Sequence, residues 1–417
     1  MAKNIYATEE KIQAYKSLTD VIGLQDLVIV GHEFDEINER VMLICVSRWP
    51  VAVCPDCSYP NTDIHDYPNQ RTIHDSPIGG RPAVLVFDSR RFECPHCGNL
   101  FMEKIRDVAG SCSYTYRLMA EIADAKRKQA ITTLAETYQL GYKLVESIIL
   151  KAGEEKIAGR KKEPIEVKHL GIDEISLHKG QGKYVLVLTD LKRRIVLDIL
   201  SDRRKKSLMA WLEKPPAGID LSTLETAAID LWSQYRDAVQ SVCPPTVRIV
   251  ADRFHVVQNL NETIHDIRRE AQAKAESEEE RKSLKGLRYL LLKNEKNLSA
   301  ADKERLKKLK ETHPDLHRLC ELRQELHDWY ETETTPKKAK VALDKWIEKA
   351  KSLGLKPLNK FCNTLSNWKS EIVNFFINRI TSGFVEGMNS KIKLLKRIAF
   401  GIPNFKHFRL RILWACG

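Results

Sequence analysis

The sequence lacks the long apolar segments of a membrane-spanning protein. None of its 417 residues lies in a run approaching about eighteen consecutive apolar side chains, the length that crosses a bilayer. The amino terminus opens on Met-Ala-Lys-Asn and a mixed polar stretch, without the charged flank, apolar segment and cleavage site of a secretory signal. We therefore expect neither a membrane span nor Sec-type secretion.

Cysteine is too sparse for a secreted scaffold held together by disulfides. Of the ten cysteines, four form two Cys-x-x-Cys pairs and the other six stand singly along the chain. This usage predicts a reducing cytoplasm and one metal site rather than a disulfide framework.

Acidic side chains are fewer than basic ones. The chain has 68 Lys and Arg against 56 Asp and Glu, which gives a formal net charge of +12. An excess of positive charge favours a polyanionic partner, of which nucleic acid is one candidate on composition alone. The length is sufficient for roughly two to four domains, each with its own core.

Residues 26–103 contain short runs in which apolar and polar side chains alternate, which predicts a small β module. Two Cys-x-x-Cys corners each follow an apolar run in this module and supply four thiolates in tetrahedral reach of one Zn²⁺. A redox dithiol is disfavoured because no βαβ pattern surrounds either pair, and a pair of unliganded corners is the remaining alternative. The predicted structural zinc ligands are Cys54, Cys57, Cys94 and Cys97.

The spacer between the two corners is longer than is usual for a zinc ribbon, with 36 residues between Cys57 and Cys94. Histidine is a common alternative zinc ligand, so three nearby histidines are possible substitutes for a cysteine. We favour a surface position for these histidines, which are His65, His74 and His96.

From residue 113 to residue 150 the pattern becomes helical, and residues 131–149 resemble a helix-turn-helix. Two positions are irregular: Gln139 stands where Gly often turns the chain, and Gly141 takes the N-cap position usually held by Ser or Thr. An ordinary αα-hairpin is the alternative. DNA binding is favoured by four basic residues, Lys126, Arg127, Lys128 and Lys143.

A polar stretch over residues 153–164 predicts a linker, after which strands and helices alternate. We expect strands over 167–174, 183–191 and 194–200, a helix over 205–213, a strand over 225–230, a helix over 231–242 and a strand over 246–252. The order βββαβαβ is that of an RNase H-like fold. In that order the first strand lies beside the fourth, so that Asp173 and Asp230 converge at one edge of the sheet.

Beyond His255, about 120 highly charged helical residues resemble an inserted subdomain with solvated faces. The last segment predicts a helix over residues 378–397 whose polar face carries Glu386, Asn389 and Lys393. From residue 391 to residue 411 the sequence has seven basic residues and no acidic one, which favours phosphate contact over solvation. These seven are Lys391, Lys393, Lys396, Arg397, Lys406, Arg409 and Arg411.

Together these motifs resemble those of the ISL3-type insertion-sequence transposases, a branch of the Mutator-like DDE transposases. The resemblance covers nearly the whole chain. It is carried by the double Cys-Pro-x-Cys ribbon with Arg90-Arg-Phe-Glu-Cys, the helix-turn-helix, Leu170-Gly-Ile-Asp-Glu, Asp252-Arg-Phe-His-Val-Val, Glu386-Gly-Met-Asn-Ser-Lys-Ile-Lys, Lys396-Arg-Ile-Ala-Phe-Gly and Phe408-Arg-Leu-Arg-Ile-Leu. It implies an enzyme that recognises the terminal inverted repeats of a mobile element, hydrolyses DNA at its ends and joins the 3′ ends to target DNA.

Such chemistry needs a nucleophilic water or 3′-OH and neutralised charge on the leaving oxygen, which two Mg²⁺ or Mn²⁺ ions supply through carboxylate ligands. The resemblance implies a catalytic and metal-binding triad of Asp173, Asp230 and Glu386. The second acid has an alternative, because Asp252 also ends a strand. The strand count favours Asp230, and Asp252 with His255 then resembles an accessory motif near the active site.

The predicted organisation is an α+β multidomain chain with an RNase H-like catalytic core interrupted by a helical insertion. We expect a zinc-ribbon module over 1–110, a helix-turn-helix over 111–163, the first part of the core over 164–260, the insertion over 261–370 and the last part of the core over 371–417. The expected partner is double-stranded DNA, bound by a homodimer or higher oligomer in a bacterial cytoplasm. Two alternatives stay open: a DNA-binding regulator with an inactive core, and a nuclease of RNA–DNA hybrids.

Overall fold

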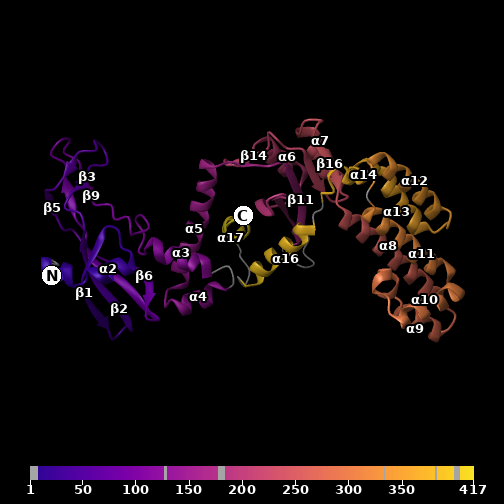
Figure 1. Ribbon diagram of the computed structural model, residues 1–417, viewed down its shortest axis with the longest axis horizontal. Helices are drawn as coiled ribbons and strands as arrows, with labels where there is room; N and C mark the ends of the chain where they lie inside the picture. The colour runs from indigo at the N-terminus through magenta and orange to yellow at the C-terminus, as the bar shows by residue number, and fades with distance from the viewer. Residues whose placement is uncertain (1–7, 126–128, 177–183, 333, 381–382, 399–403) are drawn as a thin grey trace. The chain divides into compact units, whose positions relative to one another are not determined.

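The computed structural model describes residues 8–125, 129–176, 184–332, 334–380, 383–398 and 404–417 (Figure 1). Contacts divide the chain into two compact units. Unit 1 holds the described part of residues 1–156, and unit 2 holds the described parts of residues 157–397 and 403–417. Within the described residues, every helix is too short or too polar to cross a bilayer.

Unit 1 is built on a four-stranded sheet of order β1-β2-β7-β6. Its apolar face packs against two short helices, through Thr19 and Ile22 of the second helix and the buried Leu27, Ile29 and Leu85 of the sheet. The elements are α1 (Glu9–Ala14), α2 (Lys16–Ile22), β1 (Leu27–Asp35), β2 (Arg40–Ser47), β6 (Gln70–Ile78) and β7 (Arg81–Asp88).

Five short strands form the ribbon beside this sheet (Figure 1). They are β3 (Ala52–Val53), β4 (Pro60–Asn61), β5 (Ile64–Asp66), β8 (Arg91–Glu93) and β9 (Leu100–Met102). The long spacer between the two Cys-x-x-Cys corners has a structural reason, because it contains the β6–β7 hairpin. That hairpin leaves the ribbon and pairs with β2 in the larger sheet.

Three helices follow the ribbon in the chain: α3 (Tyr116–Ala125), α4 (Ile131–Thr137) and α5 (Tyr142–Lys162), the last of which contains the boundary between the two units. The linker predicted over residues 153–164 is wrong, because α5 continues to Lys162. Apart from two glycines, the segment consists mainly of Glu, Lys, Arg and Ala, which are good helix formers, and Pro164 follows its end.

Unit 2 contains a five-stranded sheet of order β13-β12-β11-β15-β16. The first three strands are antiparallel, whereas β11, β15 and β16 run parallel to one another. The first and fourth strands are therefore neighbours, as the element order predicts. The strands are β11 (His169–Ser176), β12 (Tyr184–Asp190), β13 (Ile195–Leu200), β15 (Thr226–Ile229) and β16 (Arg248–Ala251), with a separate pair β10 (Ile165–Glu166) and β14 (Ile219–Asp220).

Helices cover this sheet and extend from its edge. Two crossover helices, α6 (Lys205–Glu213) and α7 (Ser233–Val242), bury Leu208, Trp211 and Tyr235 in the same apolar cluster as Leu186 and Leu188 of β12. The carboxyl-terminal helices are α16 (Gly383–Ile398) and α17 (Phe405–Cys416), and α17 packs on β13.

A group of helices follows β16 and packs together at one end of unit 2 (Figure 1). It comprises α8 (Arg253–Lys274), α9 (Glu278–Gly286), α10 (Ala300–Thr312), α11 (Pro314–Glu331), α12 (Pro336–Lys351), α13 (Lys356–Asn367), α14 (Lys369–Val373) and α15 (Phe375–Asn378), with 3₁₀ turns at Leu290–Leu292 and Glu295–Asn297. Helix α8 is continuous through residues 260 and 261, the predicted boundary between the first part of the core and the helical insertion. The apolar core is likewise continuous from the sheet into these helices.

Helix α17 is tied to the sheet by a buried charge. Asp198 of β13 is 2% exposed and accepts hydrogen bonds from Arg409 Nε at 2.5 Å, Arg409 Nη2 at 3.0 Å and Trp211 Nε1 at 2.9 Å. A buried carboxylate is tolerated only when its charge is paired and its oxygens are hydrogen-bonded. Arg409 therefore provides the charge that allows Asp198 to stay inside.

Removing that cation should destabilise unit 2. In Arg409→Ala the carboxylate of Asp198 stays buried without its charge partner, and we expect a loss of about 3–5 kcal/mol in the free energy of unfolding. Urea unfolding followed by tryptophan fluorescence measures this loss. The control is Lys406→Ala on the same helix, where the exposed side chain should contribute less than about 0.5 kcal/mol. Equal stability of the two variants would contradict the structural role of Arg409.

Candidate functional site

Three aspartates lie at one register level on the three parallel strands. Gly171 of β11 pairs with Ala228 of β15, and Ala228 pairs with Val250 of β16. Two residues beyond each of these positions are Asp173, Asp230 and Asp252. Asp173 lies within β11, and Asp230 and Asp252 directly follow β15 and β16. Because alternate residues of a strand share a face, the three acids lie side by side.

Asp173 is the best-connected of the three acids. Its Oδ2 accepts a hydrogen bond of 2.7 Å from Asn389 Nδ2, and its Oδ1 lies 3.8 Å from His255 Nε2. Burial raises the pKa of the Asp173 carboxyl, and the His255 side chain opposes that rise. The bond from Asn389 joins helix α16 to strand β11 across 216 positions of sequence.

A cavity of about 220 Å³ opens in front of Asp173. Helix α16 contributes Glu386, Asn389 and Lys393 to its wall, which are the three residues predicted to share the polar face of that helix. The start of α8 contributes Asp252 and His255, whose Oδ2 and Nε2 atoms lie 3.7 Å apart. Asp252 is also the N-cap of α8, because its Oδ1 accepts the Phe254 backbone N–H at 3.1 Å.

Asp230 lies between the other two acids in the strand order but does not line this cavity. Its Oδ1 is buried without a hydrogen-bond partner. Burial is the main cause that raises the pKa of Asp230 to about 6; nearby Glu174 and Asp173 raise it further, while His255 lowers it. Asp230 is thus a partly desolvated carboxyl within the electrostatic field of the same site.

Glu174, next to Asp173, is held by a cation and a phenol. It accepts hydrogen bonds from Arg203 Nη1 at 2.7 Å and from Tyr235 OH at 2.9 Å. The guanidinium of Arg203 lies 4.1 Å from the ring centroid of Tyr184 and 4.6 Å from that of Trp232. These contacts neutralise a fourth carboxylate beside the aspartates and fix its position.

The carboxylates supply the hard oxygen donors that Mg²⁺ and Mn²⁺ prefer. The buried oxygen of Asp230 has no hydrogen-bond partner, and the pKa values of Asp230 and Asp173 are raised. A bound cation would favour the ionised forms of both carboxyls. Within the described residues, however, the cysteine group of unit 1 is the only set of three or more His, Cys, Asp or Glu side chains whose ligand atoms all lie within 4.8 Å of one another.

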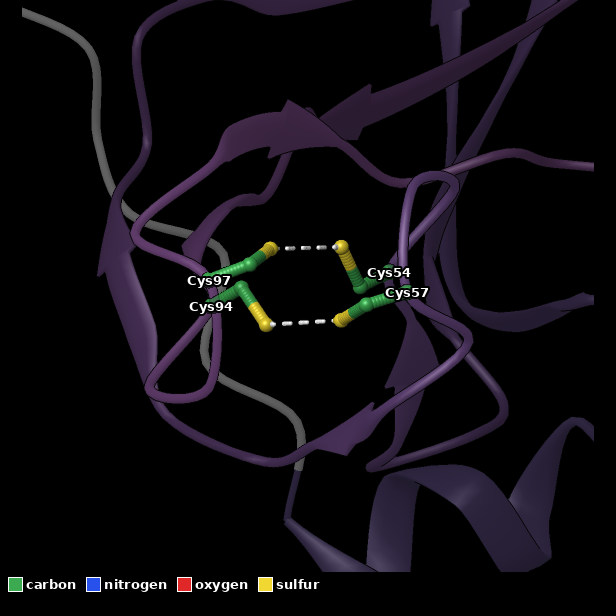
Figure 2. Close-up of side chains that lie close together, drawn as sticks. All are labelled: Cys54, Cys57, Cys94 and Cys97. Carbon is green, nitrogen blue, oxygen red and sulfur yellow. Dashed lines mark hydrogen bonds between the residues drawn. The ribbon is translucent and has the colours of Figure 1, made fainter.

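That cysteine group consists of Cys54, Cys57, Cys94 and Cys97, whose sulfurs point toward one another (Figure 2). The sulfurs of Cys54 and Cys97 are 3.7 Å apart, and those of Cys57 and Cys94 are 3.5 Å apart. Four sulfurs at about 2.3 Å from a tetrahedral Zn²⁺ lie about 3.8 Å from one another. The four thiols therefore fit one structural zinc ion, as predicted.

The two corners have the same local geometry. Cys54 N–H donates to Tyr59 O and Cys94 N–H donates to Asn99 O, both at 2.9 Å. The residue after the second cysteine of each corner has a positive φ, 61° at Ser58 and 70° at Gly98, which turns the chain back. Burial raises the pKa of Cys54, but hydrogen bonds from the Cys57 and Asp56 backbone amides outweigh it and lower the pKa to about 6.

The three histidines considered as substitutes do not join this cysteine group. His65 Nδ1 lies 3.2 Å from Glu93, and His96 stacks on Tyr59 with ring centroids 5.8 Å apart. His74 lies in β6 of the larger sheet, where burial lowers its pKa.

The predicted DNA-binding cations differ in exposure. Lys143 of α5 and Lys391, Lys393 and Arg397 of α16 are exposed, and Lys396 is half-buried. Lys391 Nζ also donates to Ala415 O at 2.9 Å.

The other two predicted cations are arginines of α17. The Arg409 side chain is 29% exposed and is engaged by Asp198, and Arg411 is only 3% exposed. Burial gives a phosphate contact of Arg411 no support from the structure. Lys126, Arg127 and Lys128 lie outside the described residues.

Sequence reasoning missed the roles of Asn389, Glu174 and Arg203. Asn389 stands three residues after Glu386 on one helix face, and this spacing is the signal that could have indicated its role. Glu174 follows Asp173 directly, but the cation that holds it lies 29 positions away, a separation that no local pattern reveals.

Comparisons with known proteins identify the class. Residues 170–412, more than half of the chain, match the ISL3 family of DDE transposases, and residues 50–97 match the zinc finger of the transposases of IS204, IS1001, IS1096 and IS1165. The chain therefore belongs to the ISL3 family of DDE transposases and is a transposase with an amino-terminal zinc ribbon.

Two named relatives extend the likeness over most of the chain. The transposase of insertion sequence element IS1001 from Bordetella parapertussis is 28% identical over 365 residues, which cover 87% of this chain and 88% of that protein. The transposase of IS1557 from Mycobacterium tuberculosis is 26% identical over 345 residues, which cover 76% and 75%. No solved structure matches significantly.

Zinc should be present at one ion per chain in protein purified without chelator. Its binding should stabilise the ribbon by something on the order of 10 kcal/mol. We expect Cys94→Ser to lose the ion and unfold the ribbon, as measured by metal analysis and proteolysis. The control Cys243→Ser, outside the ribbon, should retain one zinc per chain. Metal-free wild-type protein with a folded ribbon would rule out a structural zinc.

Proposed function

We propose that this transposase binds the terminal inverted repeats of its insertion sequence, cleaves DNA at the element's ends and joins the 3′ ends to target DNA. The observation that carries the proposal is the row of three aspartates at one register level, with Asp173 within β11 and the other two directly after β15 and β16. Asn389 attaches the helix that bears Glu386 to Asp173. The strand order β13-β12-β11-β15-β16 supports an RNase H-like core.

We assign the catalytic roles to Asp173, Asp230 and Glu386, which would hold two Mg²⁺ or Mn²⁺ ions. When bound, the ions would activate the attacking water or 3′-OH and neutralise charge on the leaving oxygen. Asp173 would contribute to both ions, and Asp230 and Glu386 to one each. Asn389 keeps the Asp173 carboxylate in one orientation, and the Arg203–Glu174 pair limits the negative charge around it.

Asp230 is preferred to Asp252 as the second acid for two reasons. Its strand lies directly beside β11, and its buried Oδ1 has no hydrogen-bond partner, so that the oxygen is available to a cation. Asp252 already caps α8 and lies next to His255, which suits an accessory role. The opposing observation is that Asp252, not Asp230, lines the cavity with Glu386.

DNA recognition is assigned to helices α4 and α5 as a helix-turn-helix, with Lys143 exposed on α5. The irregular position Gln139 has a φ of 51°, the left-handed conformation for which Gly is usual in that turn. The exposed cations of α16 would contact phosphates near the acids. Two copies of the chain, or more, would assemble on the two ends of the element.

A regulator with an inactive core would bind the ends without cutting them, and a nuclease of hybrids would degrade them. Incubation with DNA that carries the element's ends distinguishes these classes, because a transposase nicks at one phosphodiester. The intact set of candidate acids favours the transposase, in agreement with the family.

Substitution of each aspartate by alanine tests whether Asp230 or Asp252 is the second catalytic acid. We expect Asp230→Ala to abolish end cleavage while binding to the inverted repeats survives, because a metal ligand is lost. Asp252→Ala should keep a remnant of cleavage, since the loss of a group outside the ligand set costs only about 10–100-fold. The measurement is nicking of labelled element ends.

Cysteine variants make this test sharper. A thiolate is a poor ligand for Mg²⁺ and a better one for Mn²⁺, so Mn²⁺ should restore cleavage in Asp230→Cys. If Mn²⁺ rescues Asp252→Cys instead, and Asp230→Ala cleaves normally, the triad is Asp173, Asp252 and Glu386.

The salt dependence of DNA binding tests the cations of α16. Each neutralised phosphate contributes about 0.9 to the slope of log affinity against log salt concentration. Lys396→Ala with Arg397→Ala should reduce that slope by up to about two without altering the preferred sequence. The matched control is Lys356→Ala with Lys360→Ala on α13, which should leave the slope unchanged. Equal slopes for the wild type and both double variants would mean that the α16 cations face solvent.

A further inference from the structure

Unit 1 also contains a cavity, which is separate from the zinc cysteines and from the acids of unit 2. It measures about 830 Å³ and lies between the end of β7 and the segment 102–116 that follows the ribbon. Its wall is partly apolar, with the buried Phe87, Ile105 and Val108 and the exposed ring of Tyr116.

The register of the surrounding strands brings a set of polar groups to this cavity. Arg71 of β6 pairs with Phe87 of β7, and Ser89 N–H donates to Asn69 O at 2.8 Å just beyond that pair. Arg71, Phe87 and Ser89 therefore lie on the same face. On the other side, Glu103 N–H donates to Arg90 O at 3.0 Å, which brings the following Lys104 close to Ser89.

The cavity carries a surplus of positive charge. Four of its lining residues are cationic, but two of these are neutralised: Arg90 Nε donates to Glu103 at 2.8 Å, and Arg106 Nε donates to Asp26 at 2.9 Å. In the described part of the chain, no ion pair is found for the other two, Arg71 and Lys104. They leave a surplus of two positive charges.

Arg71 and Ser89 are built into the wall rather than standing on the surface. Arg71 Nη2 donates to Cys112 O at 3.2 Å, and its guanidinium lies 5.6 Å from the Phe87 ring. Burial alone lowers the pKa of Arg71. Ser89 is 5% exposed, and its Oγ is buried without a hydrogen-bond partner. A buried hydroxyl without a partner favours a ligand that can satisfy it.

We propose that this cavity binds a phosphodiester of the DNA backbone, with Arg71 and Lys104 as the cations and Ser89 Oγ as a hydroxyl donor. A guanidinium, an ammonium and a hydroxyl together match the several acceptor oxygens of a phosphate. The adjoining deoxyribose would lie on the apolar wall beside the Tyr116 ring. The inference rests on the proposed function to the extent that the chain must bind DNA.

Binding of element-end duplex by full-length variants tests the proposal. Arg71→Gln with Lys104→Gln should weaken affinity about 10- to 100-fold, and Ser89→Ala about 2- to 10-fold. The matched control is Lys11→Gln with Lys16→Gln, which removes two exposed charges from helices α1 and α2 of the same unit and should leave affinity within about 2-fold. Zinc content and circular dichroism verify folding.

Protection of Lys104 from chemical acetylation provides a measurement on the wild-type protein. Bound duplex should slow acetylation of Lys104 at least about 5-fold relative to Lys16, which lies outside the cavity. Inorganic phosphate at matched ionic strength should protect Lys104 far less. Equal protection by inorganic phosphate would overturn the assignment to DNA and indicate a general anion site.

The outcomes separate this inference from the proposed function. Wild-type protein that binds no element-end DNA would overturn the proposed function and this site with it. Wild-type protein that binds, together with a double variant of equal affinity and an unprotected Lys104, would overturn the site alone. Equal weakening by the control pair would also overturn it, since the effect would then be one of net charge.

Discussion

The parallel register of β11, β15 and β16 is the constraint on which the rest of unit 2 depends. Neighbouring parallel strands run in the same direction, so residues that follow a paired position by the same number of residues lie side by side. Here those residues are all aspartates, and their burial raises the pKa values of Asp173 and Asp230. Such a row of acids is costly without compensating contacts, and the surrounding structure supplies the amide of Asn389 to Asp173 and the guanidinium of Arg203 to the neighbouring Glu174.

The two predicted metal sites of this transposase differ in how they are built. The zinc ligands come from two short corners whose own backbone hydrogen bonds fix each cysteine pair, so that each half of the site is local. The acidic site is assembled from strands and a helix far apart in the sequence. Its oxygen donors suit hard cations, whereas the four sulfurs suit zinc, and the two sites therefore need not compete for one metal.

Basic residues have different roles that composition does not distinguish. Arg409 neutralises the buried Asp198, and Arg203 lies between two aromatic rings and holds Glu174. Lys393 is exposed at the cavity of the acids, and Arg397 is exposed further along α16. The net charge of +12 thus includes cations that stabilise the fold as well as cations that are available to a polyanion.

The sequence by itself determined the zinc ligands, the family, the strands of the five-stranded sheet of unit 2 and the candidate acids, because spacing and alternation are local properties. It misjudged residues 153–164, where the prediction of a linker gave too little weight to helix formers around two glycines. Only the tertiary structure decided that Asn389 bonds to Asp173, that Arg409 pairs with the buried Asp198, that Arg411 lies inside, and that the long cysteine spacer contains a hairpin of another sheet. These features depend on contacts between distant segments, which a local pattern does not encode.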